Sequence, residues 1–427
     1  MMQLKEYSAR EETAQRVVLP VPFGQDYEGE RIHDVATGFE AGKKTIMFEL
    51  LTAASTEQIE DGLITLSGPD IDEISGNNTL PLALLVQVSG NLMCKDYEPV
   101  LEHHIHRILN YGHGIMHTGQ RNNTVLRISK SAISRGFRLK HLGTILHAGL
   151  HRLFGSIVDK VEVNIITNND EVTDILKHAL EIYRHRDARL KDLTDDDTDI
   201  GYSCTICQSH APGHVCIITP EHEGSCGAYS WVDCRIMHDI NPLGPSQPVP
   251  RGRLIDARTG QWENINEFVS LESGGKNNRY SLYSLITDPA PICECAEAIS
   301  CILPLCNGIM TVNRAYDGIT PSGMTFNRMM ELVGGGLSTP GFSGHSLASI
   351  TGRKFLSAED GILRLVWMPA SLKQAIAGRF TPLAIGLGLP DLIDRIADES
   401  IGVTEENTLA FLRDRKHPAL DMPPLLG

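Results

Sequence analysis

The chain has 427 residues, of which 41% are hydrophobic, and a formal net charge of −15 at pH 7. This length and apolar content allow two or three domains with sizeable cores, whereas the negative charge argues against a general nucleic-acid or membrane-surface binder. Residues 1–12 lack the apolar stretch of a signal peptide and no run of about 18 apolar residues occurs, so we expect a cytoplasmic protein without a transmembrane helix. In a reducing cytoplasm, the clustering of its ten cysteines indicates metal ligation rather than disulfides.

Strand-like and helix-like segments alternate in the first half of the chain. Short apolar runs predict strands at 45–53, 82–89, 124–129 and 160–167. Apolar residues at helical spacing predict helices at 97–111, 139–154 and 171–183. This alternation is typical of an α/β layered domain, which we place at residues 1–199. Residues 187–199 contain six aspartates and predict a solvated linker.

The amino-acid composition and the hydrophobic pattern change at residue 200. Glycine, proline and cysteine become frequent, and long helical periods disappear until about residue 370. Helices are predicted again at 370–378, 389–398 and 405–414. The predicted fold class is therefore α/β plus α+β, with a loop-rich α+β domain at residues 200–427 built around cofactor ligands.

Four cysteines gather within 23 residues of this second part: Cys204, Cys207, Cys216 and Cys226. Four thiolates so close in sequence suit a [4Fe–4S] cube. A four-cysteine zinc site is an alternative, although such sites more often use two paired CxxC knuckles. A cube that only transfers electrons is a second alternative, which would leave the next motif unexplained.

A Cys-X-Cys tripeptide follows, formed by Cys293, Glu294 and Cys295. Its two thiolates and the amide nitrogens of Glu294 and Cys295 can surround one metal in a plane, which points to Ni(II) or Cu(II). Only proline at position 294 would remove an amide donor. Two buried free cysteines are the simpler alternative. Beside a four-cysteine group, the tripeptide suggests a cube coupled to nickel.

The segment at 204–220, CTICQSHAPGHVCIITP, resembles the nickel-containing acetyl-CoA synthase family, which includes the β subunit of the acetyl-CoA decarbonylase/synthase complex. Six cysteines at the family's spacing make the resemblance specific, and it covers nearly the whole chain. Further matching stretches lie at 68–73, 136–141, 226–228, 241–245, 323–326, 333–342 and 366–369.

The resemblance implies a Ni–Ni–[4Fe–4S] cluster. Cys204, Cys207, Cys216 and Cys226 would hold the cube, and Cys207 would bridge it to a proximal nickel. Cys293 and Cys295 would bridge that nickel to a distal nickel, which the amides of Glu294 and Cys295 would complete. The implied reaction joins CO and a methyl group, supplied by a corrinoid iron–sulfur protein, with coenzyme A. Carbon monoxide dehydrogenase is the other implied partner.

Two positions depart from the family pattern. Glu294 replaces a glycine, and His210 replaces a phenylalanine that lies near the proximal nickel; an imidazole there could act as a ligand or proton donor. A divergent relative with other one-carbon or redox chemistry, or a nickel-free Fe–S protein, therefore stays open. The sequence also resembles the short form of the family, without the N-terminal domain that docks carbon monoxide dehydrogenase, so no fused CO tunnel is expected.

Residues 103–158 contain no Asp or Glu and form a basic island. Arginine forks suit the phosphates of coenzyme A, while a basic face for acidic partners is the alternative. The candidate coenzyme A residues are Arg121, Arg127, Arg135, Arg138 and Lys140.

Other motifs are weaker. His147 and His151 have the spacing of zinc ligands on a helix, but no carboxylate or cysteine adjoins them in sequence, so surface histidines are favoured. The glycines at 334–336 and 341 predict close backbone packing. The remaining cysteines are expected in or near the core, two of them on a helix after the Cys-X-Cys motif: Cys94, Cys234, Cys301 and Cys306.

Overall fold

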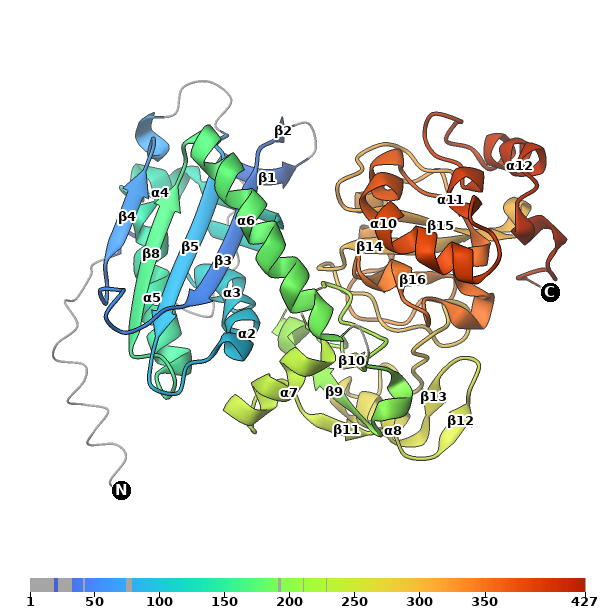
Figure 1. Ribbon diagram of the computed structural model, residues 1–427, viewed down its shortest axis with the longest axis horizontal. Coiled ribbons are helices and arrows are strands. Elements are labelled where there is room, and N and C mark those ends of the chain that lie inside the picture. The colour runs from blue at the N-terminus through green and yellow to red at the C-terminus, as the bar shows by residue number, and fades with distance from the viewer. Residues whose placement is uncertain are drawn as a thin grey trace. The chain divides into compact units, whose positions relative to one another are not determined.

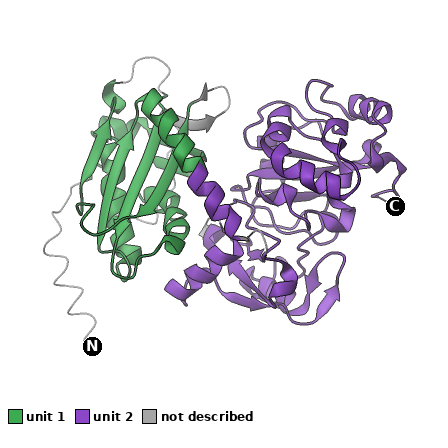
Figure 2. Cartoon of the chain, viewed as in Figure 1, with its two compact units in different colours: residues 1–180 green, residues 181–427 purple. Residues whose placement is uncertain are grey.

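The computed structural model describes residues 19–21, 33–40, 43–73, 79–190, 193–209, 211–227 and 229–426. The chain divides into two compact units, residues 1–180 and 181–427 (Figure 2). The division falls inside helix α6 (Asn169–Asp187), which begins in unit 1 and ends in unit 2. The domain boundary expected at 199–200 stays a prediction.

A mixed four-stranded sheet forms the centre of unit 1. Its order is β3-β5-β8-β4; β3 and β5 are parallel, β5 and β8 antiparallel, and β4 and β8 parallel. Helix α5 packs behind the sheet, while α6 crosses in front of it (Figure 1). The strands predicted at 45–53, 82–89 and 160–167 and the helices predicted at 139–154 and 171–183 are confirmed, whereas β4 was not predicted. The bounds are β3 (Met47–Ala53), β4 (Ile64–Ser67), β5 (Leu82–Ser89), α5 (Lys140–Phe154) and β8 (Lys160–Ile166).

A second, antiparallel sheet of unit 1 has the order β2-β1-β7-β6. The helix predicted at 97–111 is two short helices interrupted at His103 and His104, which are both buried. The apolar pattern was correct, because residues of both helices face the core. The bounds are β1 (His33–Glu40), β2 (Lys43–Lys44), α2 (Glu98–Glu102), α3 (Ile105–Leu109), β6 (Ile115–Gln120), β7 (Asn123–Ser129) and α4 (Lys130–Ser134).

The described residues of unit 2 form three small sheets. One has the order β10-β9-β11, one is the hairpin β12-β13, and the largest has the order β16-β14-β15-β17, in which β15 and β17 are parallel. The bounds are β9 (Ile200–Cys204), β10 (Cys216–Ile218), β11 (Pro248–Pro250), β12 (Leu254–Asp256), β13 (Gln261–Trp262), β14 (Ala298–Leu303), β15 (Gly308–Asn313), β16 (Phe342–His345) and β17 (Leu365–Trp367).

Three short helices that were not predicted precede residue 370 in the described part of unit 2, whereas long helices are absent from it, as expected. Two of them begin at capping hydroxyls: Ser230 accepts from the Asp233 N–H, and Thr325 accepts from the Arg328 N–H. Eight to ten residues give too few periods for a clear apolar pattern. The bounds are α7 (Trp231–Ile240), α8 (Glu263–Glu272), α9 (Phe326–Val333), α10 (Ala370–Gly386), α11 (Leu392–Arg395) and α12 (Glu405–Asp414).

The acidic stretch at 187–199 is not a uniformly solvated linker. Asp195 is 3% exposed and accepts a hydrogen bond from the hydroxyl of Tyr283. Its carboxylate also accepts from the Glu221 N–H at 2.9 Å. One aspartate of this block therefore anchors the chain to the interior of unit 2.

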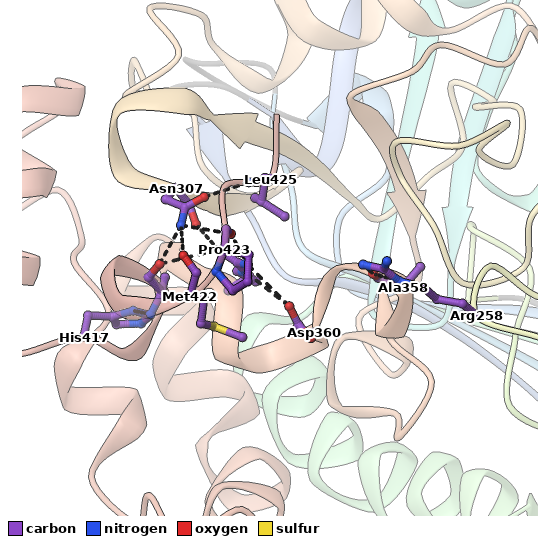
Figure 3. Close-up of polar contacts among 10 residues, drawn as sticks. Arg258, Asn307, Ala358, Asp360, His417, Met422, Pro423 and Leu425 are labelled. Carbon is purple, nitrogen blue, oxygen red and sulfur yellow. Dashed lines mark hydrogen bonds and ion pairs between the residues drawn. The ribbon is translucent and has the colours of Figure 1, made fainter. Parts of the chain in front are cut away.

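Asn307 fastens the C-terminal tail of unit 2 (Figure 3). Its Nδ2 donates to the carbonyls of Ala419 at 2.8 Å and Met422 at 3.0 Å, and its Oδ1 accepts from the Leu425 N–H at 2.9 Å. The buried Arg364 donates to the Pro423 carbonyl at 2.7 Å. These bonds satisfy tail carbonyls that no helix or sheet covers. Among the described helices, none combines the length and apolarity needed to cross a bilayer.

Candidate metal centre

Cysteines from two distant segments of unit 2 come together. The sulfur of Cys207 lies 3.7 Å from that of Cys295. The ligand atoms of Cys207, Cys293 and His214 all lie within 4.8 Å of one another. Two sulfurs bound at 2.3 Å to one tetrahedral ion would be about 3.8 Å apart. The separation of Cys207 and Cys295 therefore suits two ligands of a shared metal.

The sheet β10-β9-β11 positions the four-cysteine segment. Cys204 ends β9 and Cys216 begins β10, and the two are direct partners in the antiparallel register. Cys207 lies on the short 3-10 helix Ile206–Ser209, which follows β9. The thiol of Cys226, from the loop after β10, hydrogen-bonds with that of Cys295. Strand pairing and two short loops thus gather the four cysteines near the Cys-X-Cys turn.

Backbone hydrogen bonds join the two cysteine segments. The Glu297 N–H donates to the Ser225 carbonyl at 3.0 Å, which links the turn before β14 to the Cys226 loop. The Ala296 N–H donates to the Cys293 carbonyl at 3.0 Å and closes the Cys-X-Cys turn. The relative positions of the two motifs are therefore fixed by main-chain contacts and not only by their sulfurs.

Burial and mutual proximity set the protonation of these thiols. Desolvation raises the pKa values of Cys204 and Cys216 well above the ordinary range, and neighbouring cysteines add to the increase. Hydrogen bonds from the thiols of Cys207 and Cys295 instead lower the pKa of Cys293. Without a bound metal, Cys204 and Cys216 therefore stay protonated, while Cys293 is a thiolate. A multiply charged metal centre would displace those protons and relieve the repulsion between thiolates.

A glycine-rich loop packs against both cysteine segments. Gly336 has φ +83°, and a Cβ there would lie 2.6 Å from the His214 backbone nitrogen. A Cβ on Gly334 would lie 3.2 Å from the Glu294 side chain. Only glycine fits this conformation and approach without displacing the neighbouring chain. The predicted close backbone packing is confirmed at Gly334 and Gly336, but not at Gly335 and Gly341, where a Cβ would meet nothing closer than 3.9 Å.

Arg314 is a half-buried cation beside the Cys-X-Cys turn. Its Nη2 donates to the carbonyls of Glu294 and of Ala296, the latter at 3.0 Å. Burial lowers the pKa of Arg314, whereas the nearby Cys295 acts in the opposite direction. A guanidinium remains charged in proteins. It therefore offsets part of the negative charge of the thiolates.

His214 also contacts the cysteine group. It is 1% exposed, and its Nε2 lies 3.0 Å from the Cys216 sulfur. Burial lowers its pKa and keeps the ring neutral, and its Nε2 and the Cys216 thiol share a hydrogen bond. Neither His214 nor Arg314 was predicted as a site residue. The position of His214 inside the four-cysteine segment could have indicated its role. Arg314 lies 19 residues after Cys295 and belongs to no motif, so no sequence signal marks it.

The other residues singled out in the sequence agree with their predicted positions to different degrees. His210 lies outside the described residues. Cys94 is exposed, so its expected place in the core is wrong. Cys301 is buried as expected, but it lies on strand β14 and not on a helix. The structure thus separates the six clustered cysteines from the others, with Cys234 on α7 close enough to influence the pKa of Cys204.

The basic residues proposed for coenzyme A lie in unit 1. Arg121 lies 4.0 Å from the buried Glu102, and Arg138 lies 3.0 Å from Asp72. Arg127 is on β7, while Arg135 and Lys140 are exposed. Two of the five candidates therefore already have carboxylate partners, and the exposed ones are the more available to a phosphate.

A group of buried and half-buried cysteines drawn from two segments, with a cation and glycine-rich backbone beside it, forms a candidate metal site in a protein of mixed α/β fold. Family models identify it further. The model "CO dehydrogenase/acetyl-CoA synthase complex beta subunit" matches residues 19–172, and the model of the C-terminal part of the "ACS/CODH beta subunit" matches residues 183–426. The chain belongs to this family of acetyl-CoA synthase β subunits, as the sequence predicts.

Curated relatives agree with the family models. The carbon monoxide dehydrogenase/acetyl-CoA synthase subunit alpha of Moorella thermoacetica is 45% identical, over 96% of this chain and 56% of its own length. The acetyl-CoA decarbonylase/synthase complex subunit beta of Methanothermobacter thermautotrophicus is 37% identical, over 94% of this chain and 85% of its own length. This chain therefore spans little more than half of the first relative and most of the second. The names of the family and its members indicate an enzyme of acetyl-CoA synthesis or decarbonylation.

A solved structure also matches part of the chain. It is the C-terminal domain of an acetyl-coenzyme A synthase alpha subunit, 47% identical in sequence. The match covers 31% of this chain and 99% of that one, with a TM-score of 0.30.

Proposed function

We propose that this chain synthesises or cleaves acetyl-CoA at a Ni–Ni–[4Fe–4S] cluster. The observation that carries the proposal is the convergence of the four-cysteine segment with the Cys-X-Cys turn, with Cys207 and Cys295 3.7 Å apart. Family membership supports the same activity.

The donor set fits such a cluster. Cys204, Cys207, Cys216 and Cys226 would hold the [4Fe–4S] cube. Cys293 and Cys295, with the amides of Glu294 and Cys295, would hold nickel. The low pKa of Cys293 provides one thiolate before metal arrives, and Cys207, which contacts both Cys293 and Cys295, is the residue suited to bridge the two parts.

The protein's own residues prepare this site. When bound, the metal cluster would supply the bond-making between a methyl carbon, CO and the thiolate of coenzyme A. Arg314 holds the carbonyls of Glu294 and Ala296 and thereby orients the turn that carries both nickel-binding sulfurs. With Cys216 as a thiolate ligand of the cube, the His214 Nε2 that lies 3.0 Å from its sulfur would donate a hydrogen bond and lower the negative charge of the cube.

We also propose that Arg135 and Lys140, with Arg121, Arg127 and Arg138, bind the phosphates of coenzyme A. The corrinoid iron–sulfur methyl carrier and carbon monoxide dehydrogenase are the proposed protein partners, since relatives belong to a CO dehydrogenase/acetyl-CoA synthase complex.

Metal content and exchange activity test the proposal together. Anaerobically purified protein should contain about four iron and at least two nickel ions per chain and should exchange CO with the carbonyl of acetyl-CoA. Cys295→Ser should lose nickel and activity while it keeps the cube. The matched control is Cys94→Ser, because Cys94 is an exposed thiol.

Three outcomes would contradict the proposal in different ways. Iron without nickel, after incubation with nickel, would indicate an Fe–S protein. A full complement of both metals without exchange activity would indicate other one-carbon or redox chemistry. Four-cysteine binding of zinc in place of iron would indicate a structural site.

A further inference from the structure

A second set of metal-binding side chains lies in unit 1. His147 and His151 are four residues apart on α5, which places both rings on one face of the helix. Asp61, from the loop between β3 and β4, completes the set. Its Oδ1 lies 3.0 Å from the Nε2 of His147 and 3.0 Å from the Nε2 of His151. The carboxylate that is missing beside these histidines in sequence is therefore present in space.

These separations match those within a coordination shell. Ligands bound at about 2.1 Å lie about 3.0 Å apart at an octahedral edge and about 3.4 Å apart at a tetrahedral edge. The two imidazoles lie with ring centroids 4.5 Å apart. All three ligand atoms lie within 4.8 Å of one another, so one ion could reach each of them after small side-chain rotations.

The surroundings hold the carboxylate in place. The Val161 N–H donates to Asp61 Oδ1 at 3.0 Å, and the Gly62 N–H donates to the Val161 carbonyl at 2.9 Å. The Asp61 loop is thus fixed against β8. Three donors converge on one carboxylate oxygen, and a cation could replace the protons that the two imidazoles direct at it.

The site is open to solvent. The side chains of His147 and His151 are 24% and 29% exposed, and that of Asp61 is 43% exposed. An ion can enter without unfolding the unit, and water can fill the remaining coordination positions. Gly62 has φ +77°, and a Cβ there would lie 3.6 Å from the His147 Nε2. The glycine allows the loop to turn beside the ring.

We infer that Asp61, His147 and His151 bind one divalent transition-metal ion of the kind that imidazole prefers, such as zinc or nickel. This site is separate from the cysteine site, since all its ligands belong to unit 1. The ion would fasten the β3–β4 loop to α5. It would also add one metal ion per chain to an elemental analysis, independently of the proposed cluster.

The test titrates full-length protein whose cysteine-bound metals are already loaded. Isothermal calorimetry with Zn²⁺, and separately with Ni²⁺, should show one additional saturable site. His151→Gln and Asp61→Asn should each weaken binding at least about tenfold, since even loss of an outer hydrogen-bond partner of a ligand commonly does so. His178→Gln is the matched control, because His178 is an exposed histidine on α6, and it should leave binding unchanged.

Co²⁺ distinguishes the two sites by spectrum. The additional ion should give ligand-field bands without a thiolate charge-transfer band, and these bands should disappear in Asp61→Asn. Absence of saturable binding of Zn²⁺ and Ni²⁺ to the wild-type protein would overturn the inference. So would binding that survives both ligand variants, or a thiolate band from the additional Co²⁺. Loss of nickel from the cysteine site in Cys295→Ser would leave this binding unchanged, so failure of one proposal is distinguishable from failure of the other.

Discussion

Asn277 joins the glycine-rich loop to the four-cysteine segment, and its removal should destabilise unit 2. The side chain is 4% exposed. Its Nδ2 donates to the carbonyls of Gly213 and Gly336, both at 2.9 Å, and its Oδ1 accepts from the Ser338 N–H at 3.0 Å. Asn277→Ala removes three hydrogen bonds and leaves buried groups without partners. At about 1 kcal/mol for each bond, we expect a loss of about 3 kcal/mol in the free energy of unfolding.

Urea unfolding of the metal-free protein, followed by tryptophan fluorescence, measures this loss. The three tryptophans of the chain all lie in unit 2, so the signal reports that unit. Asn278→Ala is the control, because Asn278 is exposed and an exposed substitution should cost less than about 0.5 kcal/mol. Equal effects of the two variants would refute the reasoning. Asn277→Asp, which keeps the size but places a carboxylate against two carbonyls, should destabilise at least as much as Asn277→Ala.

Three further predictions concern unit 2. Gly336→Ala should destabilise it by at least about 2 kcal/mol in the same unfolding assay, because the left-handed backbone and the contact with His214 both oppose a Cβ; an unchanged urea midpoint would contradict this. Arg314→Gln should raise the pH at which Cys293 of the metal-free protein is alkylated, whereas Arg314→Lys should raise it less; identical pH profiles would show that the cation does not stabilise the thiolate. Burial lowers the pKa of His417 to about 4. The free energy of unfolding should therefore fall by about 1.4 kcal/mol for each pH unit between pH 6.5 and pH 4, and His417→Gln should reduce that slope. Equal slopes for the two proteins would contradict this last prediction.

The sign of the His417 effect follows from burial. The folded protein keeps this imidazole neutral down to about pH 4, whereas the unfolded chain protonates it near pH 6.5. Between these values the unfolded state binds more protons and gains stability as the pH falls. The contribution to folding is therefore complete above pH 6.5.

Most of unit 1 could be predicted from sequence because its signals are local. The strands at 47–53 and 82–89 are mostly apolar, and α5 has a long amphipathic period. The second sheet was harder to predict from sequence, since strand register depends on contacts between segments that are far apart in the chain. Likewise, spacing revealed His147 and His151, but Asp61 lies 86 residues before His147 and joins them only in the fold.

The candidate metal centre likewise combines residues that sequence spacing marks with residues that only the fold brings together. Sequence spacing marks the six cysteines, because thiolates that share a cluster are often supplied by short turns. It does not mark Asn277 or Arg314, whose roles depend on which carbonyls the fold brings near them. Asparagine and arginine are common surface residues, so only burial and geometry separate these two from the rest.

The charge balance of the site links metal binding to folding. Arg314 supplies one positive charge beside six thiols, while desolvation and mutual repulsion keep the pKa values of Cys204 and Cys216 high. Full deprotonation without metal would leave several buried negative charges uncompensated, which is far costlier than protonated thiols. The proposed cluster would therefore bind in exchange for protons, and its binding free energy would add to the stability of the folded site. Because the cysteines belong to unit 2, loading the cluster should stabilise that unit more than unit 1.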